Sequence, residues 1–162
     1  MSRKLDGIDI HILEELQSHG RLSIVELASR VNLTKTPCSE RVKRLERLGI
    51  IMGYRAVLDP RKVGMNHVTI VHVSLVRTSD NSLDTFNEAV KDIPEVETCM
   101  MIAGQFDYML TVRTRDITHF RTLLGETISK LPSVMQTHSF AVMETVKDNA
   151  NIPLASDEGI AS

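Results

Sequence analysis

The chain has 162 residues, of which 42% are hydrophobic and 25% charged, a composition typical of an ordinary soluble folded protein. Residues 1–62 carry 12 Lys and Arg against 8 Asp and Glu, whereas residues 63–162 carry 7 against 13, so the net charges are +4 and −6. We find neither a membrane-spanning apolar run nor a signal-peptide pattern, and expect a cytoplasmic protein of one or two small domains. The first part suits a polyanionic partner, and the second does not.

Two short helices are predicted near the N-terminus. The first covers residues 6–18, where apolar side chains recur at helical spacing. Ser23 and Glu26 make a capping-box pattern, which opens a second helix that ends at Arg30. A tight turn follows, and Asn32 tolerates the left-handed backbone conformation that such a turn needs.

A third helix is predicted over a basic segment that ends at Gly49, a residue that fits a left-handed C-terminal cap. Pro37 suits the first helical position, and Thr36 suits the capping position before it. One side of this helix is apolar, and the other carries short polar and basic side chains. Arg41 lies nearer the edge of the core and is expected to brace the fold. Three helices with a tight turn before the third predict a helix-turn-helix.

The polar side of the third helix supplies the candidate DNA-binding residues, because a helix in the major groove needs small polar groups toward bases and cations toward phosphates. The base-edge candidates are Thr36, Ser39 and Glu40, the phosphate candidates are Lys35, Lys43, Arg44 and Arg47, and Thr34 at the start of the helix completes the set. Two alternatives stay open, namely the solvated face of an ordinary amphipathic helix and a three-helix bundle that imitates the motif. The order of capping box, turn and basic helix within the positively charged part favours DNA binding.

The segment after the third helix, residues 50–59, is rich in β-prone residues and is predicted to form a strand or wing. Turn-forming residues at 59–64 mark a domain boundary. The predicted divisions are a winged helix-turn-helix domain at 1–60, a linker at 61–66, a second domain at 67–147 and a weakly ordered tail at 148–162.

The second domain contains a repeat that predicts its topology. Residues 92–96 and 130–134 share an apolar-Pro-x-Val core, and each follows a helical stretch and opens a β-prone one. The expected elements are helices at 82–92 and 118–130 and strands at 67–77, 96–103, 107–114 and 134–145. The order β-α-β-β-α-β is the ferredoxin-like pattern of an αβ-sandwich, so the fold class predicted for the whole chain is α+β.

The first strand of this domain is apolar on both sides. Val71, Val73 and Leu75 point to one face of the predicted sheet, and Val68, Ile70 and Val76 point to the other. Two helices can cover only one face of a four-stranded sheet, so the second face needs another cover. We therefore expect the chain to self-associate.

The sequence gives no indication of catalysis or of a metal centre. Cys38 and Cys99 lie at positions typical of buried free thiols, and the six His residues have no metal-ligand spacing. We find no nucleophile–base motif and no phosphate-binding loop. Neither an enzyme nor a cofactor is therefore expected.

Residues 36–46 resemble the recognition helix of the leucine-responsive/AsnC (feast/famine) family of transcriptional regulators, and residues 103–110 resemble the Gly-x-aromatic-Asp-Tyr hairpin of that family. Residues 123–127 and 140–144 are also similar, and the similarity runs from about residue 5 to 147. It implies a winged helix-turn-helix followed by an amino-acid-sensing αβ-sandwich. It also implies dimers that assemble further, commonly into octamers, with effector sites where dimers meet. Lys35 and Gln105 depart from the residues frequent in the family, and Gln105 bears on the identity of the effector.

The resemblance also implies an effector site. Its candidate residues are Gly104, Gln105, Phe106, Asp107, Tyr108, Ile117, Phe140, Ala141 and Val142. Asp107 is suited to receive the ammonium group of an amino acid, and backbone N–H groups near Gly104 are suited to receive its carboxylate. A purely structural role stays open, in which Gly104 makes the turn, Asp107 caps it and Phe106 fills core.

The predicted function is a sequence-specific regulator of transcription that binds double-stranded DNA and responds to a free amino acid, leucine-like by the resemblance. One alternative is an architectural DNA-binding protein without an effector. A second, from a different class, is an enzyme, or the small-molecule-binding regulatory subunit of one, built on the second domain. Retention on heparin at low salt distinguishes these hypotheses, because a DNA-binding protein should be retained and a small-molecule enzyme need not be.

Overall fold

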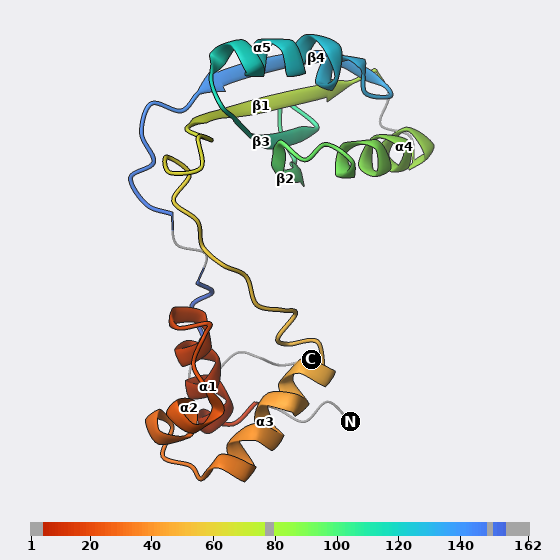
Figure 1. The fold of residues 1–162 in the computed structure, drawn as a ribbon. Helices are drawn as coiled ribbons and strands as arrows, with labels where there is room; N and C mark the ends of the chain where they lie inside the picture. The colour runs from red at the N-terminus through yellow and green to blue at the C-terminus, as the bar shows by residue number, and fades with distance from the viewer. Residues whose placement is uncertain (1–4, 77–79, 149–150, 155–162) are drawn as a thin grey trace. The chain divides into compact units, whose positions relative to one another are not determined.

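The computed structural model describes residues 5–76, 80–148 and 151–154 (Figure 1). These residues form two compact units. One contains the residues up to Val57 together with the C-terminal residues from Asp148 onward, and the other is Leu58–Lys147. No helix of the described residues is long and apolar enough to cross a membrane.

The N-terminal unit packs three helices, α1 (Gly7–Ser18), α2 (Ile24–Arg30) and α3 (Lys35–Arg47), around one apolar core. The capping box predicted at Ser23 and Glu26 is confirmed. Asn32 has the left-handed conformation expected of the turn, with φ of 55°. The buried residues of this core are Ile12, Leu13, Leu27, Ala28, Val31, Cys38, Val42 and Leu45.

The start of α3 differs from the prediction. The capping position is Thr34, which makes no side-chain capping hydrogen bond, and the first helical residue is Lys35. Thr36 and Pro37 therefore lie inside the first turn, and the prediction that they cap and open the helix is wrong. Pro37 is tolerated there because the first four N–H groups of a helix have no partner within it.

The end of α3 is as predicted, but the segment after it is not a strand. Gly49 has a left-handed φ of 70°, and the Ile50 N–H donates to the Leu45 carbonyl at 3.0 Å, which closes the helix. Residues 50–59, predicted as a strand or wing, contain no strand. A strand needs a neighbour for its backbone N–H and C=O groups, and the one sheet among the described residues does not include this segment.

A buried carboxylate joins α1 to α3. The Asp9 side chain is 1% exposed and accepts hydrogen bonds from Arg41 Nη1 at 2.8 Å and Arg44 Nη2 at 2.5 Å. Arg41 also donates to Asp6 at 2.7 Å. Burial alone would raise the pKa of Asp6, but the hydrogen bonds from Arg41 and from the Asp9 N–H outweigh it and lower the pKa. The bracing role expected of Arg41 is confirmed.

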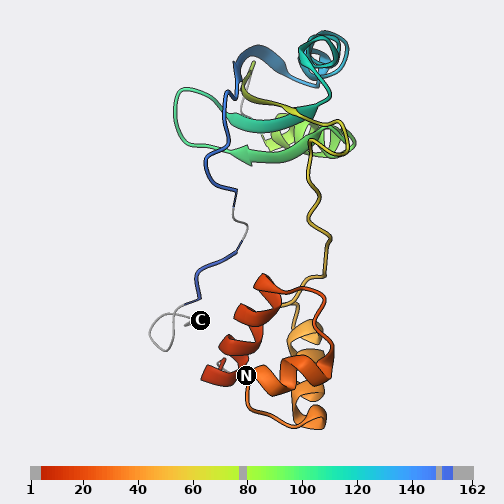
Figure 2. The same ribbon diagram turned by 60° about the vertical axis from the view of Figure 1, so that its left-hand side comes forward.

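The second unit is a four-stranded antiparallel sheet with two helices on one face (Figure 2). Its elements are β1 (His67–Leu75), α4 (Asp80–Lys91), β2 (Val96–Met101), β3 (Tyr108–Thr114), α5 (Ile117–Glu126), the 3-10 turn η1 (Ile128–Lys130) and β4 (Val134–Ala141). The strand order β2-β3-β1-β4 and the chain order β-α-β-β-α-β confirm the predicted ferredoxin-like αβ-sandwich. The last helix is shorter than predicted, because the chain tightens into η1 after Thr127.

One face of the sheet packs against the helices. Val71 and Val73 of β1 and Leu110 of β3 are fully buried, and they form one cluster with Phe86 of α4 and Phe120 of α5. This confirms the alternation read from the first strand. The core of the second unit is therefore complete on the side that the helices cover.

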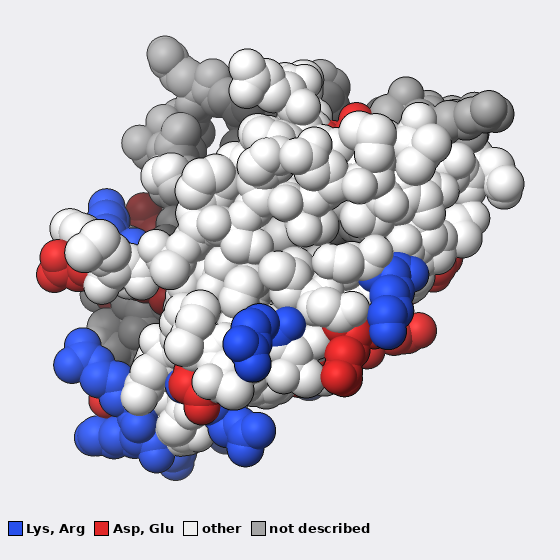
Figure 3. Space-filling view, turned by 90° about the horizontal axis from the view of Figure 1, so that it is seen from above, with Lys and Arg blue, Asp and Glu red and all other residues white. Residues whose placement is uncertain are grey.

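The opposite face of the sheet is covered by no described helix or strand. The strand registers place Ile70, His72, Met109 and Phe140 on it, and Phe140 is 52% exposed. The edge strand β4 contains no charged residue. Viewed from above, on the side where α5 and β4 lie, the molecule presents a broad area of uncharged side chains (Figure 3). Apolar faces and uncharged edge strands favour pairing with another chain.

Four C-terminal residues, 151–154, lie against the N-terminal unit, in the tail that the sequence predicts to be weakly ordered. The Gln17 side chain hydrogen-bonds the backbone of Ile152, and Leu154 packs against the apolar core. The two compact units do not test the domain limits that we predicted from the sequence, and those limits remain predictions.

Asp9→Asn is expected to lower the free energy of unfolding of the N-terminal unit by about 2–3 kcal/mol, because Arg44 then loses its charged acceptor inside the fold and Arg41 keeps only Asp6. Urea titration, with hydrogen exchange of the α1–α3 amides as readout, measures this change. Glu14→Gln, which alters an exposed carboxylate on the same helix, is the matched control and should stay within about 0.5 kcal/mol. Equal effects of the two variants would contradict a central role for Asp9.

Candidate functional site

The polar side of α3 is the candidate surface for DNA. Most of the predicted residues on it are exposed, namely Thr34, Lys35, Thr36, Glu40, Lys43 and Arg47, and Ser39 and Arg44 are half-buried. None of the ion pairs among the described residues involves Lys35, Lys43 or Arg47. These three cations are therefore available to an external anion.

Arg44 differs from the other phosphate candidates. Its guanidinium is bound by the buried Asp9 carboxylate, and only 21% of its side chain is exposed. A cation that pairs with an internal carboxylate has less to gain from a phosphate, because it would first lose its partner. The structure thus separates Arg44 from Lys43 and Arg47, which the sequence could not distinguish from it.

The segment that follows α3 is tied back to the helix. The Tyr54 hydroxyl donates to Glu46 Oε1 at 3.0 Å. Burial, with the Glu46 carboxylate adding to it, raises the pKa of Tyr54 to about 12. The phenol therefore stays protonated at neutral pH and keeps this donor.

The hairpin predicted to bind the effector joins β2 to β3. Ile102 N–H donates to the Asp107 carbonyl at 2.9 Å, and Asp107 N–H donates to the Val73 carbonyl at 3.0 Å. The Asp107 Oδ2 atom accepts from the Leu75 N–H at 2.7 Å. One carboxylate oxygen thus fixes the end of β1, which is the capping role that the sequence left open. A ligand-binding role would have to be added to this structural one.

The aromatic residues of the hairpin point to opposite faces of the sheet. Tyr108 is 2% exposed and packs on Phe86 with ring centroids 4.4 Å apart, and burial raises its pKa. Phe106 lies on the open face, where its ring centroid is 4.6 Å from that of His72 and 5.2 Å from that of His138. A ligand on the open face would therefore meet Phe106, and Tyr108 would support it from the core.

Most candidate effector residues lie in a row along β1. The Asp107 hairpin lies at the Val73–Leu75 end, and the His72 ring, which is 5.1 Å from that of Phe140, links Phe106 to Phe140. Ala141 and Val142 follow Phe140 directly, toward the start of β1, and Ile117 is exposed at the first position of α5. On β1, Thr69 pairs with Ala141, and the Val68 carbonyl accepts from the Val142 N–H.

The candidates at the two ends of this row are far apart. The Asp107 carboxylate hydrogen-bonds Leu75, seven residues along β1 from Val68, and a strand rises about 3.4 Å per residue, so Asp107 and Val142 lie roughly 24 Å apart along the strand. A single amino acid does not reach from one of these two residues to the other, whereas Phe140 and Ala141 between them are consecutive in the chain.

Sequence reasoning missed His72 and His138, which face each other across β1 and β4 on the open face. Together with Phe106 and Phe140 they make a cluster of four rings, which we call the aromatic cluster. Residues alternate between the two faces along β1, so His72 lies on the same face as Ile70. This alternation was enough to predict that His72 faces the open side of the sheet. Among the described residues, no group of three or more His, Cys, Asp or Glu is placed to hold a metal ion.

Both parts of the chain match known protein families. The family described as "Winged helix-turn-helix DNA-binding" matches residues 5–52, which include α1, α2 and α3. The family described as "Lrp/AsnC ligand binding domain" matches residues 68–152, which include all of the sheet but its first residue, and both of its helices.

Known proteins that match nearly the whole chain include regulators of transcription. The chain is 52% identical over 144 residues to the proline dehydrogenase transcriptional activator of Rhizobium radiobacter, covering 89% of this chain and 92% of that protein. It is 45% identical over 147 residues to the leucine-responsive regulatory protein of Escherichia coli K12, covering 91% and 90%. Among solved structures, a transcriptional regulator from Neisseria meningitidis in complex with L-Met superposes with a TM-score of 0.87 at 34% identity, covering 93% and 97%.

Proposed function

The chain belongs to the Lrp/AsnC family of DNA-binding transcriptional regulators, and from this premise we propose that it is a sequence-specific regulator whose activity or assembly responds to a free amino acid with an apolar side chain. The family consists of regulators and not of enzymes, so the enzyme alternative is excluded. The ligand-binding domain argues against an architectural protein without an effector. Because the proposed partner is chromosomal DNA, we place the protein in the cytoplasm.

The observation that carries the DNA-binding part of the proposal is the unpaired basic side of α3. Lys35, Lys43 and Arg47 are exposed, and no described carboxylate neutralises them. We propose that these three contact phosphates, which supply much of the affinity for DNA. Thr34, Thr36, Ser39 and Glu40 lie in the first turns of the helix and are our candidates for base edges. Arg44 holds α3 in place through Asp9.

We propose that the effector is a leucine-like amino acid that lies against the aromatic cluster. Rings and methionine side chains on the open face suit an aliphatic side chain, and Asp107 beside them suits an ammonium group. The L-Met complex of the Neisseria meningitidis regulator supports this class of ligand. Proline is a second candidate, because the Rhizobium radiobacter relative is named for the activation of proline dehydrogenase.

We further propose that the chain forms dimers that assemble into larger oligomers, octamers in the fully assembled state. The open sheet face and the uncharged β4 need a cover that the described residues of one chain do not provide. We place the effector site where copies meet, as the family resemblance implies, with the Asp107 hairpin supplied by one copy and Ile117, Ala141 and Val142 by its neighbour.

Lys43→Ala and Arg47→Ala are each expected to weaken binding to all DNA sequences by a similar factor. Each should also reduce the slope of log K against log salt by about one, because one phosphate contact is lost. Fluorescence anisotropy across a salt series measures both quantities. Lys91→Ala, which removes an exposed cation from α4 in the other unit, is the control. Unchanged slopes in both α3 variants would show that this side of the helix does not follow the DNA backbone.

Light scattering at micromolar concentration is expected to give a dimer or a larger assembly. Ile70→Lys, which puts a charge on the open sheet face, should shift the mass downward by a factor of two or more, because burying an unpaired charge is costly. Thr85→Lys, on the exposed side of α4, is the matched control and should leave the mass unchanged. A monomer for the unaltered chain would remove the assembly proposal.

Asp107→Asn is expected to lose effector binding while it keeps DNA binding without effector. Asparagine can still accept the Leu75 N–H bond but cannot form the charge-assisted bond to an ammonium group, so affinity should fall roughly ten- to a hundredfold. Calorimetric titration with the best ligand from a thermal-shift screen of free amino acids is the measurement. Normal affinity in Asp107→Asn, with loss only in Asp107→Ala, would make Asp107 a structural cap.

A further inference from the structure

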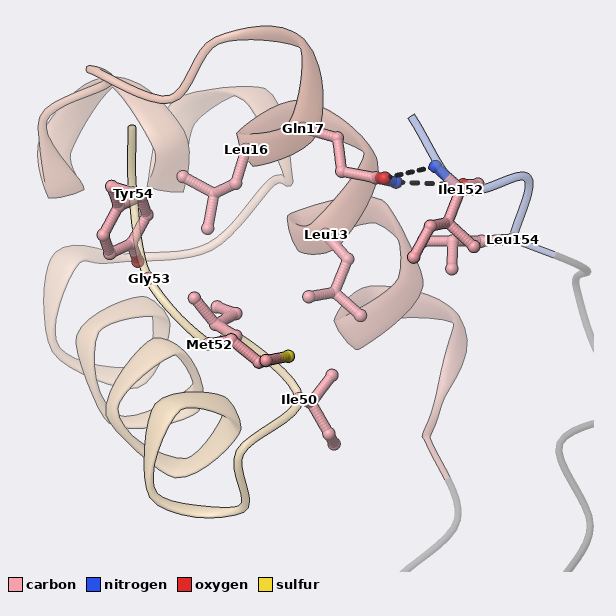
Figure 4. Close-up of a pocket in the computed structure, with 10 residues that line it drawn as sticks. Leu13, Leu16, Gln17, Ile50, Met52, Gly53, Tyr54, Ile152 and Leu154 are labelled. Carbon is pink, nitrogen blue, oxygen red and sulfur yellow. Dashed lines mark hydrogen bonds between the residues drawn. The ribbon is translucent and has the colours of Figure 1, made fainter. Parts of the chain in front are cut away.

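The N-terminal unit has an apolar groove along α1, and C-terminal residues of the same chain form one of its walls (Figure 4). Leu13 and Leu16 of α1 form its floor. Residues 50–54, which follow α3, form one wall, and Ile152 and Leu154 form the other. The space between the walls is about 270 Å³. The groove thus separates two segments that are about 100 residues apart in sequence.

One side chain holds the backbone of the C-terminal segment. Gln17 Oε1 accepts the Ile152 N–H at 2.6 Å, and Gln17 Nε2 donates to the Ile152 carbonyl at 3.1 Å (Figure 4). A single amide therefore satisfies both backbone groups of one residue, as a neighbouring strand would. This contact does not depend on the Ile152 side chain, which is 68% exposed.

Leu154 supplies the apolar part of the contact. Its side chain is half-buried and packs against the core cluster of the three helices. Ile152 is followed by Pro153, which restricts the backbone of Ile152 to an extended conformation. Pro153 itself has no N–H that needs a hydrogen-bond partner. The segment Ile152-Pro153-Leu154 is therefore preorganised to present its backbone to Gln17 and its leucine to the core.

We infer that the surface of α1 beside this groove, around Leu13 and Gln17, is a docking site for an extended apolar-Pro-apolar segment, and that its occupant is the chain's own tail, residues 151–154. The inference goes beyond the proposed regulatory function and does not depend on it. The chain leaves the N-terminal unit near Val57 and returns to it after Lys147, so the docked tail belongs to the same unit as the helix-turn-helix. A tail attached to the same chain also has a high effective concentration at the groove, which favours docking despite the small contact.

Docking of the tail has a consequence for the segment after the recognition helix. Residues 50–54 continue directly from the Gly49 cap of α3 and face the tail across the groove. When the tail leaves, Leu13 and Leu16 become more exposed, and residues 50–54 lose the opposite wall. Release of the tail should thus loosen the segment that connects α3 to the rest of the chain.

Hydrogen exchange on the full chain tests the docking. Ile152→Pro removes the N–H that Gln17 accepts, and Leu154→Asp puts a charge against the core, so both should speed exchange of the α1 and 50–54 amides at least tenfold. Ile152→Ala is the matched control, because it keeps the N–H and alters a mostly exposed side chain, and it should stay within twofold. Unchanged exchange in both Ile152→Pro and Leu154→Asp would overturn the inference.

Mixed assemblies test whose tail occupies this docking site. One chain carries Gln17→Ala with an intact tail, and the other ends at Lys147 with Gln17 intact, and the two are co-expressed. If each tail docks on its own chain, neither chain has both halves of the contact, and the fast exchange of 50–54 persists in the mixture. Slow exchange restored in the truncated chain would show that a partner's tail fills this docking site, and would overturn the assignment to the chain's own tail.

Discussion

The carboxylate of Asp9 decides which cations of α3 face inward. Arg41 and Arg44 turn toward it and fix the helix against α1, so Lys43 and Arg47 are left on the outer side. An ionised group this deeply buried is costly, and two guanidinium partners together with a backbone N–H from Asp6 offset that cost. The third helix buries only Cys38, Val42 and Leu45, so its position depends on these charges as well as on packing.

The apolar residues of the second unit lie on two faces of the sheet, of which one is buried under helices and the other is left uncovered. Helices α4 and α5 cover the buried face, and the aromatic cluster lies on the uncovered face. Rings that remain partly exposed in one chain are suited to hold either a second copy or a small apolar ligand, and the two uses can share one surface. This explains how the same sheet can serve both assembly and effector recognition in the function that we propose.

Local patterns predicted most of the fold, because their physical cause is local. The Ser23–Glu26 capping box and the alternation of β1 each depend on residues a few positions apart. The start of α3 was misplaced because the missing N–H of Pro37 fits any position in a first turn equally well. The contact of Gln17 with Ile152 spans 135 residues and has no local pattern. The effector candidates came from separate stretches of the sequence, and only the strand registers show that Phe106 and Phe140 lie close to each other while Asp107 and Val142 lie far apart.

The open face of the sheet has a consequence for the amount of protein that the effector needs. A ligand that binds where two copies of the chain meet on this face, as we propose, has an apparent affinity that depends on how much of the protein is assembled. Dilution of the protein would then weaken effector binding even when the effector concentration is held constant. A cell that makes more of such a regulator would raise its sensitivity to the amino acid as well as its occupancy of DNA, and the signal would report protein abundance and nutrient supply together.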